Sequence, residues 1–322
     1  MTLADVVAGA ILVALNAYVL LGGADFGGGV WDLFARGSRR TSQRDLIERA
    51  IGPVWEANHV WLILAVVLLF TCFPPAFARL AIALHVPLSL VLIGIVLRGS
   101  AFTFRSYGGG REEERRWGRV FAVASLVTPV LLGVVVGTIA SGAVTRLPTP
   151  YPGFFPTYIA PWLTPFAFAV GLFTLACFAF LAAVYLTLEA RERALQEDFR
   201  RRAIGAGVAV FIMAALGLLL SHQGPRVGGG LVTATGIVGV SAFAALWGRR
   251  YRAARVAAAA QVSLILWGWG LAQFPYLLPP DLTVARAAAP AVTLELVLGA
   301  LGLGALVLFP SLYYLFRVFK AK

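Results

Sequence analysis

The sequence predicts an all-α polytopic membrane protein that crosses the bilayer about nine times and forms one integral-membrane domain over residues 1–322. Hydrophobic residues make up 60% of the chain and charged residues only 13%, about half the charged fraction of a typical soluble domain. Apolar runs of about 20 residues, the length that a transmembrane helix needs, follow one another with little between them. The runs are apolar around the whole helix, which favours lipid or a bundle interior over a soluble core.

The borders of these runs support the individual helices. The first begins without basic residues, whereas a signal peptide begins with positive charge, so we expect it to be retained. The second opens at Pro53, which suits a first helical turn. After the fourth, the proline- and aromatic-rich Leu147–Pro161 should lie along the membrane interface. The fifth should continue past the membrane through Leu188–Arg202, and the last four are uniformly apolar. The nine expected spans fall near 3–24, 51–72, 76–98, 118–143, 161–188, 204–222, 229–247, 255–276 and 291–317.

The 27 basic residues, which give a net charge of +12, predict the orientation of the chain. Most of them lie in alternate loops and in the C-terminal tail, while each of the other loops holds only one. Positive charge marks cytoplasmic loops, so we expect a periplasmic N-terminus and a cytoplasmic C-terminus. The expected partners of this charge are membrane lipids and no nucleic acid.

Polar residues inside the predicted spans are candidates for function, because they are costly to bury in a membrane. Near the inner end of the first helix, Asp25 lies between Gly23 and Gly27, whose spacing lets another helix approach closely. The alternative interpretation is a packing surface on which Asp25 pairs with a nearby arginine.

The start of the second helix adds Glu56, Asn58 and His59. The first helix runs inward and the second outward, so Asp25 and Glu56 should lie at a similar depth near the cytoplasmic side. Two acids, an amide and an imidazole at that depth could pass protons from the cytoplasm into the membrane. The alternative is a polar cluster whose members satisfy one another between two helices.

The histidines raise the question of haem binding. His59 and His85 are the only pair on adjacent predicted spans, roughly 12 and 20 Å from the inner edge at ~1.5 Å per residue. A haem iron held between two imidazoles needs them nearly level. We therefore expect no haem or metal to be bound by this chain itself.

Three sequence segments together resemble subunit II of the cytochrome bd quinol oxidases. They are the Gly-Gly-Ala-Asp-Phe-Gly-Gly-Gly stretch at 22–29, the Trp-Glu-Ala-Asn-His-Val-Trp stretch within 51–63, and the arginine- and phenylalanine-containing stretch at 97–106. Residues 273–276 and the final helix also fit this family, so the resemblance covers nearly the whole chain.

The resemblance implies two four-helix bundles plus one peripheral helix in the bacterial cytoplasmic membrane. It implies a partner, subunit I, which carries haem b, haem d and the quinol site, and it allows for a small single-helix accessory subunit and a bound quinone or lipid. Together the subunits would oxidise quinol and reduce oxygen to water in aerobic respiration. This chain would be the non-haem subunit that stabilises subunit I.

By position, the resemblance also implies roles for single residues. Protons would enter from the cytoplasm at Glu56, with Asp25 close by, and the polar residues of the same region add Asn58 and His59 to the expected path. His59 stands where other members carry glutamine, which suggests an additional titratable relay. The residues expected to have structural or interface roles are Gly23, Gly27, Trp55, Trp61, Arg98 and Arg105.

Two other functions compete with this one. A stand-alone transporter or proton channel could use the same acids, although carriers usually show broken helices around a midplane site, whereas these acids gather at one inner rim. A purely structural subunit would stabilise its partner without moving protons.

Overall fold

The computed structural model describes residues 1–322 except 53–54, 108–109, 147–150, 152, 222–228 and 321–322. The side chains of residues 55–57, 106–107, 111, 114, 229, 316 and 319–320 also lie outside the described part, although their backbone is helical. Statements below on what is absent concern the described residues.

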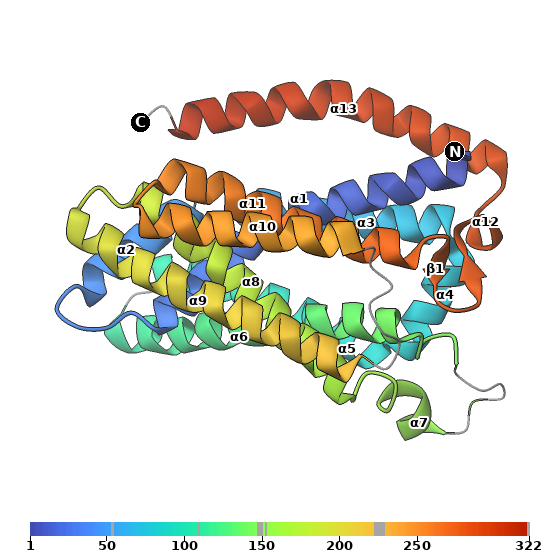
Figure 1. Cartoon of the computed structure of the whole chain (residues 1–322), viewed down its shortest axis with the longest axis horizontal. Helices are drawn as coiled ribbons and strands as arrows, with labels where there is room; N and C mark the ends of the chain where they lie inside the picture. The colour runs from blue at the N-terminus through green and yellow to red at the C-terminus, as the bar shows by residue number, and fades with distance from the viewer. Residues whose placement is uncertain (53–54, 108–109, 147–150, 152, 222–228, 321–322) are drawn as a thin grey trace.

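Thirteen helices and one short hairpin make up this part of the chain, which is predominantly helical (Figure 1). The hairpin pairs β1 with β2 in antiparallel fashion, with Leu278 opposite Leu282. The elements are α1 Leu3–Leu33, α2 Arg40–Ile51, α3 Trp55–Cys72, α4 Pro74–Ala83, α5 His85–Tyr107, α6 Arg111–Ser141, α7 Phe154–Tyr158, α8 Pro165–Glu189, α9 Arg193–Leu220, α10 Gly229–Trp247, α11 Tyr251–Gln273, β1 Tyr276–Leu278, β2 Leu282–Thr283, α12 Val284–Ala287 and α13 Ala291–Lys320.

The helix ends follow ordinary local chemistry. α1 begins with a capping box, in which the backbone N–H of Asp5 donates to Thr2 Oγ1 and the Thr2 N–H donates to Asp5. α8 begins at Pro165 behind Thr164, whose hydroxyl accepts from the Ala167 N–H. α6 ends where Gly142 takes a left-handed conformation with φ +74.

Among the described residues, eight helices are long and apolar enough to cross a membrane, and the bent pair α3–α4 would make a ninth. The chain is therefore a multi-pass α-helical membrane protein, as predicted. The third span, however, was misplaced at 76–98. The membrane-crossing helix is α5, and residues 74–83 form the separate helix α4, bent by 117° from α3. Pro74 lacks a backbone N–H and disfavours helical backbone at Phe73, so the chain turns there.

The prediction that the fifth helix continues through Leu188–Arg202 was also wrong. α8 ends at Glu189, Ala190 is extended, and α9 starts afresh at Arg193. The charged first turns of α9 thus belong to the next helix. α1 in turn runs nine residues past the predicted inner end at 24 and reaches Leu33, so Asp25 lies well inside it.

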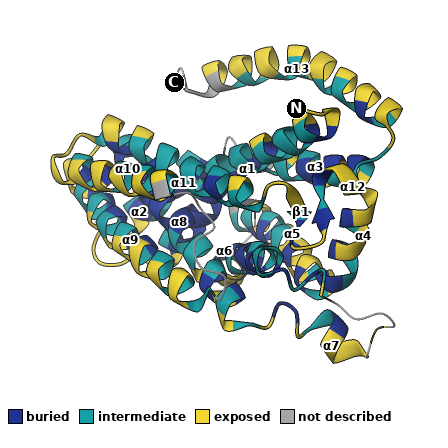
Figure 2. Cartoon of the chain, turned by 45° about the vertical axis from the view of Figure 1, so that its right-hand side comes forward, coloured by how far each residue is buried: buried dark blue, intermediate teal, exposed yellow. Residues whose placement is uncertain are grey.

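The spanning helices form two groups of four and one outlier, which confirms the predicted arrangement. α1, α3, α5 and α6 pack together, α8 to α11 form the second group, and the two groups meet where α8 contacts α1 and α6. α13 makes its main contacts with α1 and α3 and lies apart from both groups, with most of its surface exposed (Figure 2).

Glycines on α1 let the two groups approach closely. A Cβ on Gly23 would lie 2.8 Å from the Phe178 ring of α8, and one on Gly27 would overlap the Phe178 carbonyl oxygen. Phe178 is 2% exposed and belongs to the largest apolar core. The contact places Asp25, between these glycines, beside the seam of the two bundles.

Candidate functional site

The centre of the first bundle holds a buried ion pair between α1 and α5. Arg98 donates to both carboxylate oxygens of Asp25, from Nη1 at 2.8 Å and from Nη2 at 2.7 Å. Its Nη2 also donates to the Asp25 carbonyl oxygen at 3.0 Å, and its Nε to Ser125 Oγ of α6 at 3.1 Å. Arg98 is 1% exposed and Asp25 is 3% exposed. Both charges are therefore removed from water and fully matched to each other.

Two aromatic rings enclose the Arg98 guanidinium. Its central carbon lies 4.8 Å from the ring centroid of Phe26 and 4.8 Å from that of Phe121. At such distances the ring faces attract the cation. The rings also exclude water, which strengthens the electrostatic attraction within the pair.

α3 adds polar groups to the same part of α1. Asn58 is 2% exposed and donates from Nδ2 to the Leu21 carbonyl oxygen at 3.4 Å. The His59 ring lies between the rings of Tyr18 and Phe26, with centroids 6.0 and 6.1 Å away. The structure thus brings together Asp25, Asn58, His59 and Arg98 from three helices.

Not every predicted site residue can be placed. The side chains of Trp55 and Glu56 lie outside the described residues, so the proximity of Glu56 to Asp25 stays a prediction. Trp61 is partly buried against the main apolar core. Asp25 has both oxygens engaged by Arg98, which agrees with the alternative of an arginine-paired acid; proton transfer through Asp25 stays a prediction.

A second ion-pair site, which the sequence analysis did not assign, lies two turns nearer the C-terminal end of α1. Asp32 is 1% exposed and contacts Arg105 Nη1 at 3.1 Å and Arg44 Nε at 3.5 Å. Asp25 and Asp32 are seven residues apart, and so are Arg98 and Arg105. Residues at that spacing share a helix face, so the matched spacing on two helices was the signal that could have revealed both pairs.

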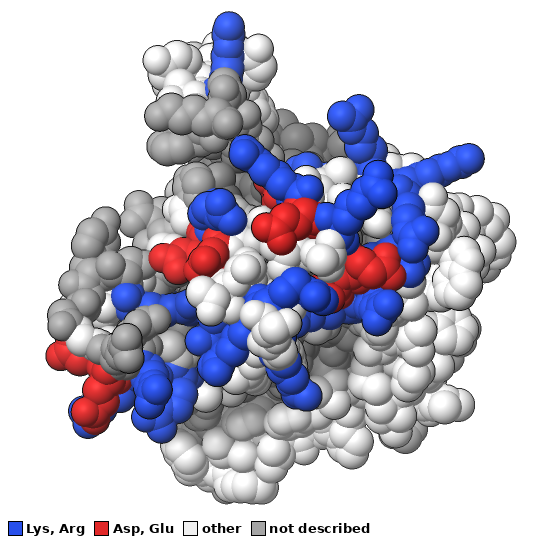
Figure 3. All heavy atoms as spheres, turned by 90° about the vertical axis from the view of Figure 1, so that its left-hand side faces the viewer, with Lys and Arg blue, Asp and Glu red and all other residues white. Residues whose placement is uncertain are grey.

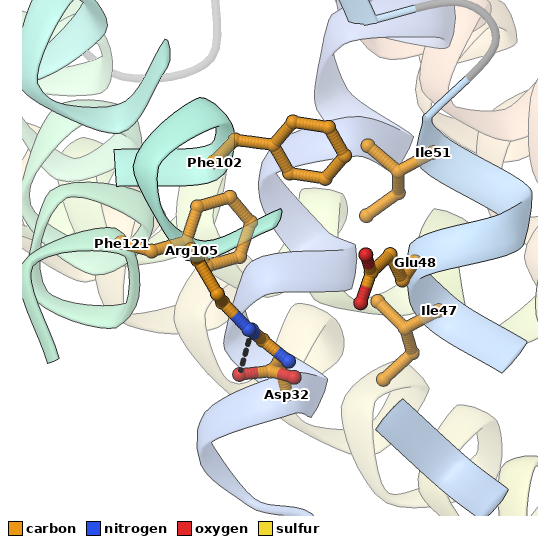
Figure 4. Close-up of a pocket in the computed structure, with 7 residues that line it drawn as sticks. All are labelled: Asp32, Ile47, Glu48, Ile51, Phe102, Arg105 and Phe121. Atoms are coloured by element: carbon orange, nitrogen blue, oxygen red, sulfur yellow. Dashed lines mark hydrogen bonds and ion pairs between the residues drawn. The ribbon is translucent and has the colours of Figure 1, made fainter. Parts of the chain in front are cut away.

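A small pocket adjoins the second pair. Figure 4 shows Glu48 of α2 facing Arg105 and Asp32 across this pocket, with Phe102 and Phe121 on its other side. Ile47 and Ile51 complete the lining. Two carboxylates and one arginine therefore border a small, mostly apolar pocket at the end of the bundle that holds the basic residues.

Basic side chains gather on that end face, interspersed with acids (Figure 3). Arg39, just before α2, binds Asp198 of α9 with nitrogen–oxygen distances of 2.7 and 2.9 Å. Gln43 donates to Asp198 at 3.0 Å and accepts from Arg202 at 2.7 Å. These contacts join the second helix to the second bundle outside the apolar core.

The described residues contain no group of three His, Cys, Asp or Glu side chains that could hold a metal ion. His59 is wedged between two aromatic rings, and His85 is the first residue of α5, with its ring 6.2 Å from that of Tyr158. The predicted span 76–98, from which the depth of His85 was counted, was wrong, because the helix begins at this residue rather than at 76. Whether this chain binds haem itself stays a prediction.

Comparison with known proteins bears on what this arrangement does. A sequence model of the family described as "Cytochrome bd terminal oxidase subunit II" matches residues 3–319. The cytochrome bd ubiquinol oxidase subunit 2 of Bacillus subtilis (strain 168) is 33% identical over 132 residues, 41% of this chain and 38% of the relative. The putative cytochrome bd menaquinol oxidase subunit II of the same organism is 23% identical over 322 aligned residues, 94% of this chain and 91% of the relative.

Two further comparisons agree. The cytochrome bd-I ubiquinol oxidase subunit 2 of Escherichia coli (strain K12) is 27% identical over 180 residues, 55% of this chain and 46% of the relative. The alignments to this protein and to the first Bacillus relative thus span less than half of each relative's length. In the structure of the bd oxidase from Geobacillus thermodenitrificans, one chain has the same fold, with a TM-score of 0.73, 23% identity and 99% of both chains covered.

Proposed function

The chain belongs to the cytochrome bd terminal oxidase subunit II family, and from this premise we propose that it is the non-haem subunit of a bacterial quinol oxidase. The complex oxidises quinol and reduces oxygen to water in the cytoplasmic membrane. Haem b and haem d belong to subunit I in this proposal. The family match over residues 3–319 carries it, and the crowded position of His59 supports placing the haem ligands in the partner.

The proposed contact with subunit I uses α1, α3, α5 and α13. α13 packs only loosely on α1 and α3 and exposes apolar side chains such as Leu303 and Leu306, each more than 70% exposed. α3 and α5 expose Ile63 and Leu92, which are 60% and 62% exposed. Such apolar surface suits a second membrane subunit, and covering it would stabilise the haem-bearing partner.

We place the path by which protons enter from the cytoplasm along α1 and α3. Glu56 takes up protons near the basic end of the bundle, and His59 lies one residue beyond Asn58 against α1. The Asp25–Arg98 pair fixes the helices around this route. Support comes from the three buried polar side chains Asp25, Asn58 and Arg98, which are costly to place between membrane helices.

Glu56→Gln is the direct test of the path. In the purified complex, we expect oxygen consumption to fall at least about tenfold, because a proton donor or acceptor in a rate-limiting transfer is worth that much or more. Reduced-minus-oxidised spectra should still show haem b and haem d. The matched control is Glu192→Gln, an exposed glutamate at the start of α9, which should keep full turnover.

Other outcomes of these measurements would favour other functions. Unchanged turnover in the Glu56 variant would remove the proton path, and loss of haems would reduce the role to stabilising subunit I. Haem in the isolated chain would make it a cytochrome in its own right. Absence of haem from both the isolated chain and its co-purified partners would favour a transporter.

His59→Gln tests whether the histidine is an additional relay. Glutamine keeps hydrogen-bonding groups of similar size but cannot take up a proton, so we expect the dependence of turnover on pH to change between about pH 5 and 8, where histidine ordinarily titrates. Turnover that matches the unmodified complex at every pH would eliminate the relay.

A further inference from the structure

Tyr18 is a buried phenol on α1 that neither ion pair uses. It is 2% exposed, and its hydroxyl has no hydrogen-bond partner among the described residues. Its ring lies over Gly22, where a Cβ would be 3.0 Å from Cε2, so the side chain extends along α1 towards Asp25. Buried hydroxyl groups in proteins are nearly always hydrogen-bonded, so we expect the Tyr18 hydroxyl to have a hydrogen-bond partner.

His59 presents a matching group from α3. Its Nδ1 is buried and likewise has no hydrogen-bond partner among the described residues. The imidazole and phenol centroids are 6.0 Å apart, and the Phe26 ring closes the other side of the imidazole at 6.1 Å. Among the described residues, the charged groups that act on both rings are Asp25 and Arg98, and these already satisfy each other.

We propose that the Tyr18 hydroxyl and His59 Nδ1 together bind an internal water molecule between α1 and α3, and that this water extends the proton path into the membrane. The proposal rests on the proposed function. The chemistry of the two groups is complementary: the phenol O–H donates to the water oxygen, and a water O–H donates to the unprotonated ring nitrogen. Internal waters in proteins bind at such otherwise unsatisfied polar atoms.

The proton step conserves charge and atoms. A proton that reaches the water from the cytoplasmic side is matched by transfer of one water proton to Nδ1, which forms imidazolium and restores the neutral water. The imidazolium then releases its Nε2 proton to the next acceptor, and exchange of the remaining Nδ1 proton for one on Nε2 restores the starting neutral tautomer before the next transfer. Tyr18 keeps its own proton throughout and acts as a positioning residue, because its hydroxyl holds the water in line with Nδ1.

Tyr18→Phe removes the hydroxyl and keeps the ring. In the complex reconstituted into lipid vesicles, we expect proton uptake during turnover to slow about fivefold, as follows from loss of one ordinary hydrogen bond in the transfer step. The H₂O-to-D₂O rate ratio should rise, because proton transfer becomes more rate-limiting, and the haem spectra should stay unchanged. The matched control is Tyr185→Phe, at a partly buried tyrosine on α8 beside Arg255.

Equal effects of the two tyrosine variants, or an unchanged rate and isotope ratio in Tyr18→Phe, would overturn the proposal. A high-resolution density map of the unmodified complex gives a readout that does not depend on any variant folding. It should show a water within hydrogen-bond distance of both Tyr18 Oη and His59 Nδ1. A direct bond of either atom to another protein or partner group, with no water between them, would overturn the site.

The outcomes separate this site from the proposed function. Slow uptake in Tyr18→Phe with normal uptake in Glu56→Gln would keep the water site and remove Glu56 as the point of uptake. The reverse result would keep Glu56 and remove the water site. Gly22→Ala provides a further check, because its methyl group would displace the Tyr18 ring and should slow uptake as Tyr18→Phe does.

Discussion

Arg98→Gln is expected to destabilise the folded chain by about 3–5 kcal/mol, the typical cost of removing one partner from a buried ion pair. The substitution leaves the Asp25 carboxylate 3% exposed without its cation. It also removes the donors to the Asp25 carbonyl and to Ser125. We expect little assembled complex to survive purification, with haem absorbance per unit of membrane protein as the measurement.

Arg105→Gln is the matched control for this prediction. Arg105 pairs with Asp32 at 3.1 Å, but its side chain is 13% exposed against 1% for Arg98, and Arg44 also contacts Asp32. Its loss should therefore cost clearly less. The double variant Arg98→Gln with Asp25→Asn should recover part of the loss, because no unpaired charge remains. If the Arg98 and Arg105 variants gave equal yields of assembled complex, the Asp25–Arg98 pair would not stabilise the protein more than the Asp32–Arg105 pair does.

Gly27→Ala is expected to lower stability by about 1–3 kcal/mol, as overpacking of a closed contact does. The added methyl would overlap the Phe178 carbonyl oxygen and lie 2.7 Å from the Ala182 Cβ. A backbone oxygen cannot rotate away as a side chain can, so the two bundles must separate. The measurement is the midpoint of thermal unfolding of the purified protein in detergent, which should fall.

Gly9→Ala on the same helix controls for the change of residue type. A Cβ at Gly9 meets no atom within 4 Å, and alanine favours helix over glycine by up to about 1 kcal/mol. Its unfolding midpoint should stay the same or rise. If both glycine variants behaved alike, close packing at Gly27 would not explain the glycine there.

Several features of the site could be read in part from the sequence. The spacing of Gly23 and Gly27 indicated a close helix contact, and Asp25 had arginine pairing as an alternative. The identity of the arginine was not predictable from hydropathy, because Arg98 lies 73 residues away and five other basic residues lie near the same predicted loop. The sequence analysis did not identify the Asp32–Arg105 pair. The acids on α1 and the arginines on α5 share a spacing of seven residues, which indicates this pair.

The fold, like the site, was predicted only in part from the sequence. The membrane class and the grouping into bundles agreed with the sequence-based prediction, and the described residues give eight spans, or nine if the bent pair α3–α4 is one, against about nine expected. The break at Phe73 was missed, because Pro74 and Pro75 sit among apolar residues and average hydropathy does not register a change of direction. The start of α5 was displaced for the same reason.

The sequence alone thus determined that this protein is an α-helical membrane protein of the subunit II family, since hydropathy, charge placement and motifs are properties of consecutive residues. Only the tertiary structure decided which charges pair, that α13 stands apart, and that the rings of Tyr18 and His59 lie close together. These features depend on contacts between helices distant in the chain. The free energy of burying a charge or a hydroxyl depends on which group it contacts in the folded chain. Hydropathy and motifs along the sequence do not identify that group.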